Sequence, residues 1–67
     1  MSIYKKIEIV GTSPVSFADA TKAAVAEAAK TVKQLSWFEV TEQRGRIEKG
    51  TVAEFQVTVK IGFKLEK

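Results

Sequence analysis

Four residues carry side chains that suit a planar ligand with an imide edge and a phosphate: Trp37, Gln56, Arg44 and Arg46. An indole can stack on a planar ring, and packing at a subunit interface is the alternative role for such a tryptophan. The carboxamide of Gln56 complements the imide edge of a pyrimidine-type ring, although glutamine is also common on solvated strand faces. The guanidinium groups suit phosphate oxygens, or they are solvated charges near a strand end.

The residue types that catalysis needs are scarce. The chain has no histidine and no cysteine, which excludes Cys/His metal sites, disulfides and the common nucleophile–base pairs. The sequence Gly11-Thr12-Ser13 is a turn pattern rather than a phosphate-binding loop. We therefore expect a binding protein, not an enzyme, with no catalytic and no metal-ligating residues. The carboxylates are interspersed with lysines, as on a solvated surface: Glu8, Glu39, Glu42, Glu48 and Glu54.

The chain is short, and its 67 residues make one domain, residues 1–67. Such a chain buries only about 60% of its unfolded surface, so either oligomerisation or an unusually well-packed monomer must stabilise it. No apolar run approaches the roughly 20 residues of a membrane span. Residues 1–6 run directly into a strand pattern rather than a signal peptide, so we expect a cytoplasmic location. The net charge of +3 suits a phosphate-bearing ligand but is weak evidence for nucleic acid.

Hydrophobic patterning predicts the element order β-α-β-β. Residues alternate over 3–10, and the glycine and proline of residues 11–14 end this strand. Ser16 and Asp19 begin a helix over residues 17–33, since a hydroxyl caps free N–H groups and a carboxylate suits the helix N-terminus. Strands over 35–47 and 51–65 flank a turn at 48–50. The apolar face of the helix is formed by Phe17, Ala20, Ala24, Ala28 and Val32.

These elements predict an α+β fold with an antiparallel three-stranded sheet. The last two strands form a hairpin, and the helical crossover makes its two flanking strands parallel to each other. The third strand has an unbroken apolar row, so it takes the central position between the first and second strands. The helix covers one face of the sheet. A single helix cannot cover both faces, so the other face must meet a partner or a ligand.

The hairpin register decides which residues share that uncovered face. If the turn pairs Glu48 with Thr51, Trp37 lies opposite Gly62 and on the same face as Gln56. The glycine leaves room above the backbone for the indole. The same register predicts further cross-strand pairs: Glu39 with Lys60, Thr41 with Thr58, Gln43 with Gln56, Val40 with Val59 and Phe38 with Ile61.

The same alternation does not place the two arginines on the face of Trp37. Strict alternation sends Arg44 and Arg46 to the helix side, the face of Val40. Two alternatives remain open. Gly45 marks a bulge that re-aims both side chains, or the strand outruns the helix and presents them to a neighbour.

Several blocks of the sequence together resemble the dodecin family, of the bacterial type. They are residues 4–13, Trp-Phe-Glu-Val at 37–40, Gln-Arg-Gly-Arg-Ile at 43–47 and residues 55–63. The resemblance extends over essentially the whole chain and implies a β-α-β-β protomer in a hollow homododecamer. It also implies paired isoalloxazine rings between two symmetry-related tryptophans. In that site Trp37 is the stacking residue, Gln56 binds the pyrimidine edge of the flavin, and Arg44 lies near FMN, with Arg46 less secure.

The resemblance implies flavin storage and photoprotection, with FMN as the favoured flavin and riboflavin or FAD as alternatives. Coenzyme A is implied as a possible second ligand, near which the basic residues Lys5 and Lys64 could serve. A different class of function also fits the residues: a nucleic-acid-binding module could use Trp37 to stack bases, with basic side chains around it. We expect no nucleic acid and no membrane partner. A plain oligomeric scaffold with an incidental ligand is the third hypothesis.

Overall fold

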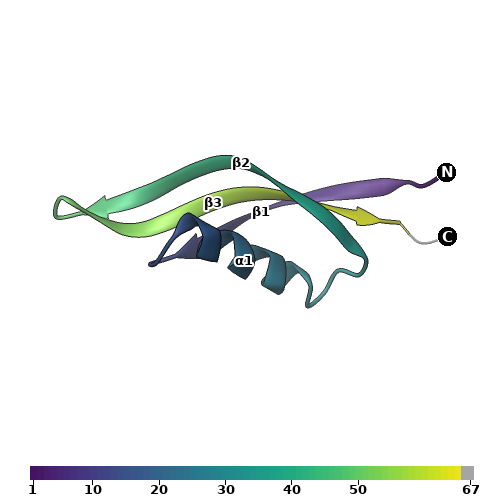
Figure 1. The fold of residues 1–67 in the computed structure, drawn as a ribbon, viewed down its shortest axis with the longest axis horizontal. Coiled ribbons are helices and arrows are strands. Elements are labelled where there is room, and N and C mark those ends of the chain that lie inside the picture. Colours follow the sequence, from purple (N-terminus) through teal and green to yellow (C-terminus); the bar gives the residue numbers. More distant parts are fainter. Residues whose placement is uncertain (66–67) are drawn as a thin grey trace.

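The structure, a computed structural model, describes residues 1–65. Its elements are β1 (Tyr4–Ser13), α1 (Phe17–Ala28), β2 (Leu35–Glu48) and β3 (Thr51–Lys64). β3 lies between β1 and β2, and both neighbours run antiparallel to it. Within these residues one helix lies against one face of the sheet, as Figure 1 shows. The predicted α+β class, the β-α-β-β order and the strand order are confirmed.

β1 is longer than predicted, because Gly11 lies within the strand and does not end it. The glycine permits close packing of α1, since a Cβ at this position would lie 2.3 Å from the carbonyl oxygen of Ala20 and 2.8 Å from the Cβ of Ala24. The strand then reaches Ser13, whose buried hydroxyl accepts a hydrogen bond from the Val15 N–H at 2.9 Å. Glycine is needed here for contact between helix and sheet, and not for a turn.

Helix α1 begins as predicted and ends five residues earlier. The Ser16 hydroxyl accepts a hydrogen bond from the Asp19 N–H at 3.0 Å, which is the predicted N-cap. The helix ends at Ala28, so Val32 of the predicted apolar face lies beyond it. The chain must change direction to enter β2, and Gln34 does so in the left-handed conformation, with φ at 62°. The alanines on the sheet side are buried as predicted: Ala20, Ala24 and Ala28.

The register of the β2–β3 hairpin shifts at three places, Leu35/Trp37, Val40/Glu42 and Arg46/Ile47, and the last two shifts are bulges that compensate each other. Strict alternation predicts none of them. The register shifts between Val40 and Glu42, which makes Thr41 an extra residue in β2. It shifts back between Arg46 and Ile47, where β3 carries the extra residue. A bulge turns the following side chains of its own strand to the other face. The second bulge lies on the partner strand and restores the register of the pairs next to the turn.

The predicted pairs at the two ends of the hairpin are confirmed: Trp37–Gly62, Phe38–Ile61, Glu39–Lys60, Val40–Val59 and Glu48–Thr51. The turn uses Lys49 and Gly50, both with positive φ (54° and 78°), as a two-residue hairpin loop requires. The two predicted pairs inside the bulged segment are wrong, because the extra residue displaces them: Glu42 replaces Thr41 opposite Thr58, and Arg44 replaces Gln43 opposite Gln56.

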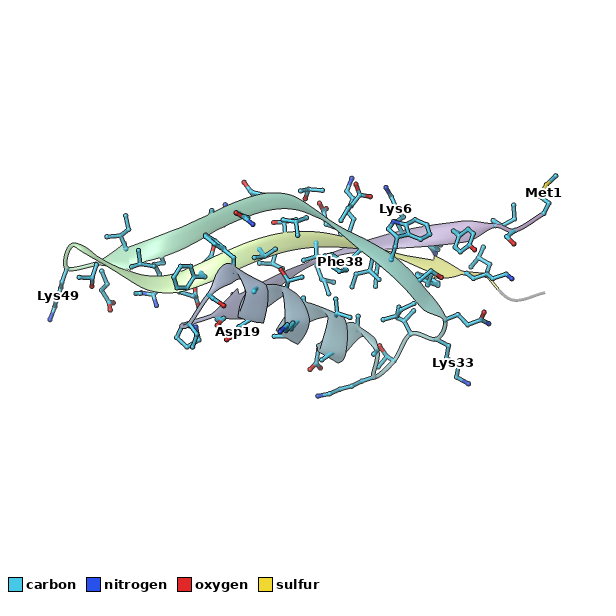
Figure 2. The ribbon with its side chains drawn as sticks, viewed as in Figure 1. Met1, Lys6, Asp19, Lys33, Phe38 and Lys49 are labelled. Atoms are coloured by element: carbon cyan, nitrogen blue, oxygen red, sulfur yellow. The ribbon has the colours of Figure 1, made fainter. Side chains whose placement is uncertain are left out.

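The protomer has a small core and an elongated shape. Its radius of gyration is 13.8 Å, compared with about 11 Å for a compact chain of this length. α1 packs on β1 and β3 and scarcely touches β2. Phe38 points to the helix side as predicted (Figure 2). Its side chain is nevertheless 52% exposed, because the helix scarcely reaches β2. The buried hydrophobic residues of the described chain are Ala20, Ala24, Ala28, Val57, Val59 and Ile61.

Strand β2 is the least buried element of the protomer. Every residue after Leu35 is exposed over the whole 14-residue strand. Its large apolar side chains include Trp37, Phe38, Val40 and Ile47, all exposed. Apolar surface of this extent on a paired strand is typical of a contact between subunits.

Candidate functional site

The indole of Trp37 lies over the central strand on the face of the sheet away from α1. Trp37 is opposite Gly62 in the register. A Cβ on Gly62 would lie 2.3 to 2.5 Å from three atoms of the indole ring, so only glycine permits this position. The tryptophan is 42% exposed, which leaves ring surface open to a ligand or a partner. The predicted placement of Trp37 opposite a glycine is confirmed.

Tyr4 of β1 packs against the same indole from across the central strand. The two ring centroids are 5.1 Å apart, and the planes are inclined at 59°. Such tilted aromatic pairs are favourable beyond the area that they bury. Tyr4 was not among the predicted site residues. The alternation of the first strand could have indicated it, because Tyr4 belongs to the set that faces away from the helix.

An ion pair spans the central strand beside the aromatic pair. Lys6 Nζ of β1 donates a hydrogen bond to Glu39 Oε1 of β2 at 2.7 Å. Figure 2 shows Lys6 on the side of the sheet away from α1. The hydrogen bond and the positive charge of Lys6 hold the pKa of Glu39 below its usual range, and Lys60 adds to this effect. The pair joins the two outer strands across β3, and Lys6 is opposite Gly62, the residue that accommodates the indole.

Replacing Lys6 by methionine should raise the pKa of Glu39 toward the ordinary glutamate value. A lowered carboxyl pKa means that the pair is fully formed above the ordinary pKa and is lost as the pH falls through the lowered value. The measurement is a pH titration of the Glu39 carboxyl carbon by NMR. Lys5→Met is the matched control, because Lys5 lies on the opposite face of the same strand. An equal shift in both variants would contradict the assignment.

The second part of the site is a row of alternating polar groups farther along the same face. Arg44 Nε donates to Gln56 Oε1 at 2.9 Å, and Gln56 Nε2 donates to Glu54 Oε1 at 2.9 Å. Arg46 Nε lies 3.8 Å from the same Glu54 oxygen. Arg46 Nη1 also donates to Glu48 Oε2 at 3.3 Å. We call Arg44, Gln56, Glu54 and Arg46 the amide row.

The bulge at Thr41 brings the arginines to this face. Strict alternation predicted them on the face of Val40, and that placement is wrong because the extra residue reverses the alternation of β2. The predicted bulge exists, but at Thr41 and not at Gly45. As a result, Arg44 and Arg46 lie on the same face as Trp37, with Arg44 directly opposite Gln56.

Lys5 and Lys64 do not form a cluster within one protomer. They lie at the same end of the sheet, but Tyr4 pairs with Lys64, so Lys5 and Lys64 point to opposite faces. Among the described residues there is no group of acidic, histidine or cysteine side chains arranged to hold a metal ion. Within residues 1–65 the only helix is too short to cross a membrane.

The fold and the site together define a small α+β protein in which the sheet face that carries the candidate site is not covered by its own helix. The Dodecin family model matches residues 3–66. The chain belongs to the dodecin family. Family membership supports a small flavin-binding protein that forms dodecamers.

Individual relatives agree over nearly the full length. A dodecin from Thermus thermophilus is 49% identical over 65 residues, covering 97% of this chain and 94% of that protein. The solved structure of dodecin from Streptomyces coelicolor gives a TM-score of 0.95 at 48% identity, covering 98% of this chain and 94% of that one. A calcium dodecin from Mycobacterium tuberculosis is 32% identical and covers 97% of this chain and 92% of its own length. Membership of this family supports self-association of the chain.

Proposed function

We propose that the protein stores FMN and protects it from light, stacking the isoalloxazine ring on Trp37 at an interface between protomers. The observation that carries this proposal is the exposed indole over Gly62, on the sheet face that the helix leaves open. An aromatic side chain held in place on an otherwise polar surface suits a planar ligand. The apolar surface of β2 supports the assembly that would complete the site.

The spacing along β3 supports a site shared between protomers. Gly62, which marks the position of the indole, is six residues from Gln56 along the strand. Six residues of a β-strand span about 20 Å. A single tricyclic ring stacked on Trp37 cannot also reach Gln56 of the same chain. The flavin on Trp37 therefore takes its Gln56 contact from a neighbouring protomer.

The amide row supports FMN over riboflavin. Arg44 uses its Nε–H toward Gln56. Guanidinium carries five N–H donors, so its two terminal nitrogens are available to a phosphate beyond that bond. Arg46 adds a second positive charge on the same face. Riboflavin has no phosphate for these groups, and FAD must place a larger group at the same position.

Contact with the indole gives the protective role a physical basis. An electron-rich indole touching an excited flavin quenches it by fast electron transfer, which suppresses photochemistry without turnover. The proposed role is therefore binding, not catalysis. Coenzyme A would be a second ligand. Since Lys5 and Lys64 point to opposite faces, a coenzyme A site that uses both needs two protomers.

A flavin titration tests the proposal. We expect apo-protein to quench FMN fluorescence at near-stoichiometric protein, with weaker binding of riboflavin, in a particle of twelve 7.4 kDa chains, about 89 kDa. Light scattering gives the mass, and FMN, riboflavin and FAD are compared by fluorescence. Salt-sensitive oligonucleotide binding that persists at saturating FMN would favour the nucleic-acid hypothesis instead. A stable monomer would contradict the shared site.

A further inference from the structure

Gln56 is held between a group that can only donate hydrogen bonds and a group that can only accept them. A guanidinium has no acceptor, and an ionised carboxylate has no donor. The amide oxygen of Gln56 must therefore face Arg44, and its amide nitrogen must face Glu54. Reversing the amide would oppose nitrogen to Arg44 and oxygen to Glu54. The chemistry of the two neighbours thus sets one orientation of the carboxamide.

The row leaves Gln56 able to bind a further partner. The amide oxygen accepts from Arg44 and keeps a second lone pair, and the amide nitrogen donates to Glu54 and keeps a second hydrogen. One acceptor and one donor with a fixed order complement an N–H next to a carbonyl, which is the imide edge of an oxidised flavin. An amide free to reverse would offer this order only part of the time.

Glu54 is well placed to maintain that order. Its side chain is 29% exposed, which is less than the exposed fractions of the two charged side chains that form ion pairs beside it, Arg46 and Glu48. The oxygen that accepts from Gln56 also lies 3.8 Å from Arg46 Nε, so the positive charge of Arg46 holds the carboxylate in place. Glu48 offers a contrast, because it pairs with Arg46 at 3.3 Å and touches neither Gln56 nor Arg44 through any hydrogen bond of the described chain.

We infer that Glu54 is a positioning residue that fixes the Gln56 carboxamide and so makes the site selective for flavins with an unsubstituted N3–H imide. The inference rests on the proposed flavin function. Glu54 acts through Gln56 and does not itself touch the flavin. It is the charge and position of Glu54, and not the stability of the sheet, that determine this selectivity.

The test compares lumiflavin with 3-methyllumiflavin, in which a methyl group replaces the imide hydrogen. The dodecameric wild-type protein should bind lumiflavin roughly tenfold more tightly, as expected for loss of a well-placed hydrogen bond. In Glu54→Ala the ratio should fall to about threefold or less, with the native mass unchanged. Glu48→Ala is the matched control and should keep the wild-type ratio. Equal ratios in the wild type and Glu54→Ala would overturn the inference.

A double-mutant cycle separates positioning from other effects of the charge. In a Gln56→Ala background, Glu54→Ala should not change the ratio further, because the amide through which it acts is gone. A further change of the same size in that background would overturn the inference. If the wild type quenches lumiflavin but shows no effect of N3 methylation, the positioning inference fails and the stacking function stands. If the wild type quenches neither flavin, the proposed function fails, and the inference fails with it.

Discussion

Replacing Trp37 by alanine should abolish the quenching of added FMN while the oligomer remains intact. Trp37 is the single tryptophan of the chain, so no other indole can donate an electron to the flavin. The side chain lies on the surface of the sheet and not among the buried residues of the core. Its removal uncovers Gly62 but creates no internal cavity. Fluorescence titration of FMN measures the first effect, and light scattering measures the second.

The phenylalanine variant distinguishes stacking from electron transfer. Trp37→Phe keeps an aromatic surface but is a poorer electron donor, so it should retain part of the FMN affinity and lose most of the quenching.

Mixed assemblies test the shared site. Protomers with Trp37→Ala and protomers with Gln56→Ala, unfolded and reassembled together, should recover wild-type FMN affinity at about a quarter of the sites if each site combines residues from two chains. If no such sites are recovered, both residues of a site come from one chain. Undiminished quenching by Trp37→Ala alone would show that the indole does not quench the flavin.

Replacing Gly11 by alanine should prevent the native packing of α1 on the sheet. The new Cβ would lie 2.3 Å from a backbone oxygen of Ala20, which no side-chain rearrangement can remove. The helix would have to move away from β1, although it provides half of the small core. Overpacking of this kind costs roughly 1–3 kcal/mol or more. In a chain of marginal stability, we expect a large fall in the melting temperature and loss of the assembly.

Two further variants make the cause of that loss specific. Thr12→Ala, at the neighbouring exposed position of β1, should leave the melting temperature nearly unchanged. Adding Ala24→Gly to Gly11→Ala removes the side-chain contact at 2.8 Å but leaves the backbone contact, so it should not rescue stability. Full rescue by Ala24→Gly, or a stable Gly11→Ala protein, would show that the helix can tilt away at little cost.

The sequence predicted the elements and failed where spacing alone carries no information. Gly11 was predicted to end the strand because glycine commonly does so. In the structure it permits contact between α1 and β1, which is a tertiary contact that the local sequence pattern does not show. The helix end was misplaced because alanine and lysine favour helix locally, while the return of the chain to β2 requires the left-handed Gln34. Both errors arose because tertiary packing, and not local sequence preference, determines where the strand and the helix end.

The candidate site was predicted in part for a related reason. Counting residues back from the turn placed Trp37 opposite Gly62 correctly only because the two bulges cancel. The same count failed between them and assigned both arginines to the wrong face. Glu54 was read as a solvated charge, since its contact with Gln56 depends on side-chain geometry that the pattern does not contain. Tyr4 and Lys6 belong to the alternating set of the first strand that faces away from the helix, but the pattern alone does not show that they contact Trp37 and Glu39, respectively.

The paired bulges also restrict how this hairpin can change in length during evolution. Loss of the extra residue at Thr41 alone would turn Arg44 and Arg46 toward the helix side and Gln43 toward the face of Trp37. Loss of the extra residue in β3 alone would displace the register next to the turn. Either single deletion separates the guanidinium groups from the amide, or the turn from its strands. Relatives with a shorter hairpin should therefore lack both extra residues together, and alignments that place one gap in this segment without the other should be regarded as misaligned.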